Sequence, residues 1–205
     1  MSADINFETI PCLIKPRQVV EAIEAYSPPM EGRRSKIRLD FNENTSVQFA
    51  SEYGVPDDIL SVYPEYTEFL EKLSEYFEFP PECILTTNGS AEALFIIPFT
   101  FIEAKQDIAI YSSPTFPVIP HSLELVESKI VAIPTLDDLL FDTHAIEVAL
   151  ERAHVSGQPA KLCIIANPDN PTGATIDIGL IENWCRRFPQ TLFVMDEAYF
   201  EYYGE

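Results

Sequence analysis

Three side chains near the end of the chain could together bind a flat ring that contains nitrogen. Asn170 lies in the run 167–173 (NPDNPTG), and Asp196 and Tyr199 lie in the run 195–199 (MDEAY). A buried carboxylate keeps an adjacent pyridine nitrogen protonated, which makes the ring a better electron sink. A carboxamide and a phenol could hold a phenolate oxygen on the same ring. These residue types therefore suit a heteroaromatic ring with a basic nitrogen and an oxygen substituent.

Apolar runs place the two clusters at the ends of neighbouring strands. Residues 162–166 (LCIIA) predict a buried strand before the first cluster, and 192–195 (LFVM) predict a strand that leads into the second. The amphipathic segment 176–188 lies between them, so strand, loop, helix and strand form one βαβ unit. Open α/β sheets bind ligands at the carboxyl ends of their strands. We therefore expect both clusters to line one site.

The two motifs together resemble the core of fold-type I aminotransferases that depend on pyridoxal phosphate (PLP), most closely the histidinol-phosphate aminotransferases. Either motif alone could be an ordinary Pro/Gly turn or an acidic strand end. The resemblance implies an α/β fold, the three-layer αβα large domain of PLP transferases, with a mainly parallel sheet and an N-terminal arm. It also implies that Asp196 holds the ring nitrogen of PLP and that Asn170 and Tyr199 hold its ring oxygen.

A strand-to-helix turn upstream could bind the phosphate group of the cofactor. Residues 83–87 (CILTT) predict a strand, and 88–90 (NGS) turn it into an apolar helix. A glycine at such a turn lets backbone N–H groups point at an anion, and a helix N-terminus adds partial positive charge. We expect Ser90 and Ala91 to be the donors, although Ser90 and Glu92 could equally be ordinary capping residues.

The resemblance implies roles for four further residues. Phe116, which follows a predicted strand at 107–111, would stack on the cofactor ring, although it could be a core aromatic at a strand-helix corner. Tyr63 matches a Tyr-Pro motif whose tyrosine reaches the cofactor phosphate of the other subunit, although alone it would be a packed loop aromatic. Asn42 and Asn44 would lie at the substrate entrance, or they could form a plain turn.

Hydrophobic patterns predict the remaining elements. A strand is expected at 128–133, and helices are expected at 16–26, 67–77, 113–127 and 143–154. The helix at 67–77 should be a core element, because its large apolar residues share one face. We divide the chain into an N-terminal arm at 1–40 and the N-terminal part of a large domain at 41–205.

Composition favours a soluble globular protein and excludes several function classes. The 205 residues are 46% hydrophobic and 22% charged, and the net charge of -20 argues against nucleic acid as a partner. The one basic run, 33–38, is predicted to be a solvated loop that enters a strand, although it could contact an anionic substrate or partner. The N-terminus has no signal-peptide pattern, and no apolar stretch approaches the ~20 residues of a membrane helix.

Cysteines and histidines show no metal-binding pattern. The cysteines lack metal or redox spacing, and we expect them to be reduced core residues in a cytoplasmic protein. The histidines share no spacing with a carboxylate cluster, and we expect them at the surface or in caps, with no metal. These residues are Cys12, Cys83, Cys163, Cys185, His121, His144 and His154.

The resemblance implies a reaction and a set of partners. Such an enzyme moves an amino group from L-histidinol phosphate to 2-oxoglutarate, giving imidazole acetol phosphate and L-glutamate in histidine biosynthesis. It uses a small-molecule amino donor and a 2-oxo acid acceptor and works as a homodimer. Alternatives are a threonine-phosphate decarboxylase, another amino-acid aminotransferase, or a non-catalytic remnant.

The lysine that the family joins covalently to PLP follows the DEAY motif. Every lysine of this chain precedes Asp196, so no catalytic residue is assigned. We expect the 205 residues to be a fragment that cannot complete transamination alone, with the rest of the large domain and a small C-terminal domain lying outside it. A lysine in a Ser-rich segment beyond Glu205 would favour the enzyme, and a stop codon would favour the remnant.

Overall fold

The computed structural model describes residues 14–17, 31–33, 35–37, 54 and 57–203. The chain divides into two compact units, one formed by 1–23 with 87–205 and the other by 24–86. Asn42, Asn44, Cys12 and most of the helix predicted at 16–26 lie outside the described residues.

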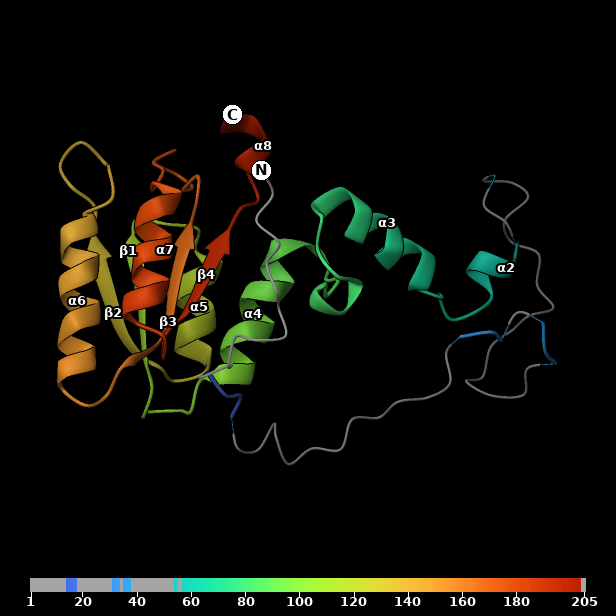
Figure 1. Cartoon of the computed structure of the whole chain (residues 1–205), viewed down its shortest axis with the longest axis horizontal. Helices are drawn as coiled ribbons and strands as arrows, with labels where there is room; N and C mark the ends of the chain where they lie inside the picture. The colour runs from blue at the N-terminus through green and yellow to red at the C-terminus, as the bar shows by residue number, and fades with distance from the viewer. Residues whose placement is uncertain (1–13, 18–30, 34, 38–53, 55–56, 204–205) are drawn as a thin grey trace. The chain divides into compact units, whose positions relative to one another are not determined.

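The larger unit contains a parallel four-stranded sheet (Figure 1). Across the sheet the order is β2 (Lys129–Pro134), β1 (Ile108–Ser113), β3 (Ala160–Ala166) and β4 (Leu192–Asp196). Ala166, the last residue of β3, pairs with Asp196, the last residue of β4. All four strands follow predicted apolar runs, and the prediction of a mainly parallel α/β fold is confirmed.

Helices cover both faces of this sheet and give it three layers (Figure 1). Helices α4 (Gly89–Phe101) and α5 (Val118–Leu125) pack on one face, and α6 (Thr143–Val155) and α7 (Ile178–Arg187) pack on the other. Side chains of β3 alternate between the two cores, because successive residues of a strand point to opposite faces. Both faces are therefore apolar, which explains the unbroken hydrophobic run of β3.

Aspartates begin the two helices of the α6/α7 layer. The side chain of Asp142 accepts a hydrogen bond from Ala145 N at 2.8 Å, and that of Asp177 accepts one from Leu180 N at 3.3 Å. Such caps satisfy N–H groups that have no partner inside the helix. The amphipathic helices predicted around 143–154 and 176–188 thus begin at identifiable residues.

The smaller unit contains short helical elements. They are α2 (Asp57–Leu60), α3 (Thr67–Phe77) and the 3-10 helix η3 (Pro81–Cys83). The helix predicted at 67–77 is confirmed, but the prediction that it is a core element is wrong. None of its residues is buried, and Phe69 and Phe77 are 50% and 47% exposed.

The strand predicted at 83–87 is also wrong. Cys83 closes η3, and residues 84–87 belong to no strand. A strand needs a hydrogen-bonded neighbour. No strand within the described part of the chain pairs with this segment.

Burial corrects two further predictions. Cys83 and Cys185 are exposed, and only Cys163 among the described cysteines is a core residue. Burial raises the pKa of the Cys163 thiol to about 12. Arg33 is 6% exposed although its run was predicted to be solvated, whereas Ser35, Lys36 and Ile37 are exposed as expected.

The described residues contain neither a membrane-spanning helix nor a metal-binding cluster of side chains. No helix there has the length and hydrophobicity that crossing a membrane requires. No group of three or more histidine, cysteine, aspartate or glutamate side chains in that part of the chain could hold a metal ion. All three histidines are exposed, in agreement with the prediction.

Candidate functional site

A cavity of about 250 Å³ lies beyond the carboxyl ends of β3 and β4. Six of the seven side chains predicted to bind a cofactor line it, together with three small residues. The lining residues are Gly89, Ser90, Ala91, Phe116, Ala166, Asn170, Asp196, Ala198 and Tyr199. The structure therefore brings together groups that are far apart in the sequence, as expected for the edge of a parallel sheet.

Asp196 places a buried carboxylate in this cavity. It is 8% exposed, and its side chain accepts a hydrogen bond from Ala198 N at 3.3 Å. Its position continues the side of β4 that carries Leu192 and Val194, which pack against the α4/α5 core. No cation pairs with this carboxylate within the described residues. A protonated ring nitrogen would supply the donor that such a buried group favours.

The first turn of α4 offers backbone donors to the same cavity. Gly89 begins the helix with φ +71°, and the preceding Asn88 makes no side-chain cap. Instead the Glu92 carboxylate accepts hydrogen bonds from Asn88 N at 2.6 Å and Asn88 Nδ2 at 2.9 Å. No described side chain accepts from the N–H groups of Ser90 or Ala91, so both donors are available to an anion. Of the two capping alternatives, Glu92 does fold back on the turn and Ser90 does not.

The loop between β3 and α7 presents Asn170 and closes on itself through hydrogen bonds. Asp169 N donates to Ala174 O at 2.9 Å, and the Asn167 side-chain oxygen accepts from Ile176 N at 3.0 Å. The Asn170 carboxamide lines the cavity and has no hydrogen-bond partner among the described residues. Its position is therefore fixed by the loop, while its polar atoms are free to bind a ligand.

The two aromatic residues of the cavity are held differently. Phe116 is partly buried and packs against the apolar core beneath α4 and α5. Tyr199 is 46% exposed and directly precedes the four-residue helix α8 (Phe200–Tyr203). Phe116 thus reaches the cavity from a packed position at the core, and Tyr199 reaches it from a short, exposed segment.

Three residues that shape the site were not predicted, and Gly89 was predicted only as the glycine of the turn. Gly89, Ala166 and Ala198 line the cavity and carry no bulky side chain. Asp169 is 3% exposed beside Asn170. The three small residues lie within or next to the sequence motifs of the site, and this position was the only indication of their role. A small side chain alone rarely identifies a binding residue.

The structure leaves the predicted roles of three residues untested. Tyr63 lies in the smaller unit, where it is 46% exposed. Asn42 and Asn44 lie outside the described residues. None of the lysines in the described part of the chain lines the cavity.

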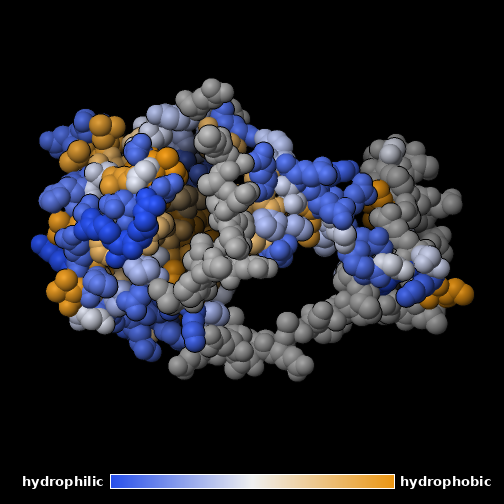
Figure 2. All heavy atoms as spheres, in the orientation of Figure 1, coloured by the Kyte–Doolittle hydropathy of each residue, from blue (hydrophilic) through white to orange (hydrophobic). Residues whose placement is uncertain are grey.

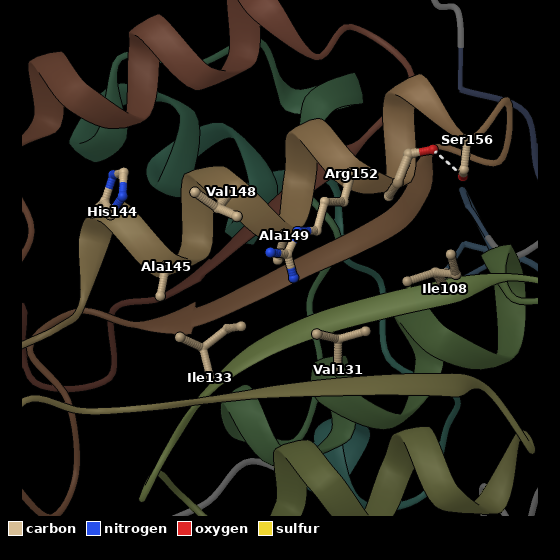
Figure 3. A pocket seen from close by; sticks show the side chains of 10 residues that line it. Ile108, Val131, Ile133, His144, Ala145, Val148, Ala149, Arg152 and Ser156 are labelled. Atoms are coloured by element: carbon tan, nitrogen blue, oxygen red, sulfur yellow. Dashed lines mark hydrogen bonds between the residues drawn. The ribbon is translucent and has the colours of Figure 1, made fainter.

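A larger cavity of about 660 Å³ lies along α6, above β1 and β2 (Figure 3). Aliphatic side chains from the three elements face one another across it, and His144 and Arg152 project from the helix beside them. No carboxylate, carboxamide or phenol lines this cavity. It lacks converging polar groups, so the candidate site is the smaller cavity.

Comparison with known proteins supports the assignment of the fold. Histidinol-phosphate aminotransferase from Aliivibrio fischeri (strain MJ11) is 29% identical over 190 residues, which cover 88% of this chain and 51% of that protein. Histidinol-phosphate aminotransferase 1 from Idiomarina loihiensis is 31% identical over 182 residues, covering 85% of this chain and 47% of that protein. The chain spans about half the length of the curated relatives it matches.

A solved structure shows the same arrangement of elements. Histidinol-phosphate aminotransferase from Sinorhizobium meliloti, crystallised in complex with pyridoxal-5'-phosphate, superposes with a TM-score of 0.58 at 26% identity. The match covers 65% of this chain and 35% of that one. The model of aminotransferase class I and II matches residues 53–205. This match extends over most of the chain, and the chain therefore belongs to the aminotransferase class I and II family.

Proposed function

We propose that the cavity beyond β3 and β4 binds PLP. The observation that carries this proposal is the buried Asp196 carboxylate, which lies in one small cavity with the unoccupied N–H donors of α4. A carboxylate and an anion-binding turn suit the two charged ends of PLP, its protonated ring nitrogen and its phosphate. When bound, PLP supplies the electron sink that stabilises negative charge on the substrate Cα.

Each lining residue takes one part of the cofactor in this proposal. Asp196 holds the proton on the ring nitrogen, Asn170 and Tyr199 bind the ring oxygen, and Phe116 covers a ring face. The N–H groups of Ser90 and Ala91 bind the phosphate. Tyr63 binds the same phosphate from a second copy of the chain, so the complete protein is a homodimer.

We further propose that the complete protein is a histidinol-phosphate aminotransferase. The relatives cited above carry this name, at 29% and 31% identity over most of the chain. The enzyme takes L-histidinol phosphate as amino donor and 2-oxoglutarate as acceptor, in the cytoplasm. Residues 1–40 form its N-terminal arm, and residues 41–205 form the first part of its large domain.

Equilibrium binding of PLP to the 205-residue chain tests the site. We expect Asp196→Asn to weaken binding by about tenfold or more, because the variant keeps the shape of the side chain and loses its charge. The matched control is Glu197→Gln, which neutralises the adjacent, exposed carboxylate and should bind as the wild type does. Equal affinity in all three proteins, or no binding by the wild type, would refute the proposal.

Turnover by a chain of the same length as the relatives tests the substrate. We expect kcat/KM to be highest for histidinol phosphate with 2-oxoglutarate. Release of carbon dioxide from threonine phosphate would indicate the decarboxylase instead. Preference for aromatic amino acids would indicate another aminotransferase, and absence of turnover on every donor would indicate the non-catalytic remnant.

A further inference from the structure

Asp169 is a buried carboxylate that has no role in the proposed function. It is 3% exposed, directly precedes Asn170, and is not among the residues that line the cavity. A carboxylate without access to water needs strong hydrogen-bond donors. The groups that supply them therefore show what this residue does.

Two loops supply the donors for Asp169. Its Oδ1 accepts a hydrogen bond from Thr115 Oγ1 at 2.8 Å, across a sequence separation of 54 residues. Its Oδ2 accepts from Thr172 Oγ1 at 2.8 Å and from Thr172 N at 3.3 Å. One oxygen thus binds the loop after β1, and the other binds the loop after β3. Hydrogen bonds to an ionised acceptor are roughly twice as strong as neutral ones.

The two loops carry different parts of the candidate site. Thr115 directly precedes Phe116, which lines the cavity with its ring, and Asp169 directly precedes Asn170, which lines it with its carboxamide. Strands β1 and β3 are hydrogen-bonded neighbours, so the loops leave the sheet side by side. The sheet fixes where each loop starts. The Asp169 carboxylate fixes the loops to each other at the residues next to the ligand-facing side chains.

We propose that Asp169 is a positioning residue that sets the separation between Phe116 and Asn170 through its hydrogen bond with Thr115. This inference rests on the proposed PLP site and deepens it. A ring that lies with one face against Phe116 can reach the Asn170 carboxamide with its oxygen substituent only if the two side chains are held at a matching distance and orientation. Because the hydrogen bond holds Phe116 and Asn170 in place before the ligand arrives, less conformational entropy is lost when the ligand binds.

Thr115→Val is the sharpest test, because it removes the bond between the loops with little change in shape. The bonds from Asp169 to Thr172 stay intact. We expect PLP to bind about five- to tenfold more weakly, because part of what this hydrogen bond contributes is lost as positioning of the site. Thr115→Ser keeps the hydroxyl and should restore the affinity. Thr175→Val is the matched control, since among the described residues its hydroxyl donates only to the exposed Tyr203 hydroxyl, at 3.3 Å.

Two readouts distinguish positioning from a general loss of stability. The circular dichroism of bound PLP at saturation should change in Thr115→Val, because Phe116 and Asn170 shift relative to each other, and it should stay as in the wild type in Thr175→Val. Thr115→Val should also unfold at a lower temperature, because the buried Asp169 Oδ1 loses its donor, so both spectra are recorded where each variant is fully folded. In the protein without ligand, hydrogen exchange should accelerate at the amides of residues 115, 116 and 118 in Thr115→Val and in both loops in Asp169→Ala.

The outcomes separate this inference from the proposed function. Wild-type affinity and unchanged exchange in Thr115→Val would overturn the positioning role, even if Asp196→Asn still loses PLP. Failure of the wild type to bind PLP would overturn the proposed function and the positioning role in PLP binding together. The exchange data would then still decide whether Asp169 joins the two loops.

Discussion

The two helical layers of the sheet differ in how they are held together and in what they hold. The α6/α7 layer combines a large apolar core with polar contacts between its helices: Trp184 Nε1 donates to Glu147 at 3.2 Å, and Arg187 pairs with Glu147 and Glu151. Figure 2 shows hydrophilic residues gathered over these two helices. The α4/α5 layer packs on a core of aliphatic and aromatic side chains.

Only the α4/α5 layer adjoins the candidate site. Its core includes Ala166 and is extended by Phe116, and α4 presents Ser90 and Ala91 to the cavity. The α6/α7 layer contributes Trp184, which is fully buried, and a polar network away from the residues that line the cavity. The comparison separates a layer that mainly stabilises the sheet from one that also sets the geometry of the site.

The largest expected effect on stability comes from Trp184→Ala. This side chain is 0% exposed and stacks with Phe193 at a ring-centroid distance of 6.4 Å. Its removal should lower the free energy of unfolding by about 3–5 kcal/mol, measured by urea denaturation. PLP affinity should be unchanged at temperatures where the variant is folded. A large loss of affinity in the folded variant would show that the α6/α7 layer also sets the geometry of the site.

Two buried leucines, one in each layer, allow the effects of the two layers on PLP binding to be compared directly. Leu94 in α4 is 2% exposed, and Leu150 in α6 is 1% exposed. Each Leu→Ala change should cost about 2–5 kcal/mol of stability, because it leaves a cavity in one core. Only Leu94→Ala should also weaken PLP binding, by about threefold or more, since it loosens the helix that presents Ser90 and Ala91. Equal losses of affinity in the two variants would show that the layers do not differ in this way.

The smallest expected effect is a pH dependence confined to the α6/α7 layer. Hydrogen bonds from Arg187, and then from Trp184, hold the pKa of Glu147 below its ordinary value of 4.5. Its contribution to stability is therefore complete above pH 4.5 and is lost as the pH falls through the lower folded pKa.

Comparison of the wild type with Glu147→Gln measures this contribution. The difference in unfolding free energy should be greatest near neutral pH and shrink in acid, and salt should reduce it because the pair is partly exposed. A difference that stays constant down to pH 3 would mean that the network does not titrate as described. The PLP affinity of the two proteins should be equal near neutral pH.

The sequence predicted the α/β unit well because its signals are local. The apolar run at 162–166 marks the buried strand β3, and the run at 192–195 marks the partly buried strand β4. Each run leads into a motif with residues that line the cavity. Predictions failed where the outcome depends on a distant partner. Residues 83–87 have strand composition but belong to no strand, and the apolar stripe of α3 says which face can be buried and not whether another element covers it.

Asp169 shows a different limit of sequence reasoning. An aspartate in a Pro-rich loop is an expected turn residue, and its spacing to Thr172 suggests only a local hydrogen bond. The bond to Thr115 arises because β1 and β3 are adjacent, which the order of residues in the chain does not reveal. Most residues that line the site were found from their chemistry or from the family resemblance, and the residue that joins the two loops could be identified only from the fold.

The most direct test of the central claim is the affinity for PLP compared with its deaza analogue, in which carbon replaces the ring nitrogen. We predict that the wild type binds PLP about tenfold more tightly than the analogue, and that this preference falls to about twofold or less in Asp196→Ala. Such coupling would show that the ring nitrogen faces Asp196. The same preference in both proteins would show that the ring nitrogen does not face Asp196.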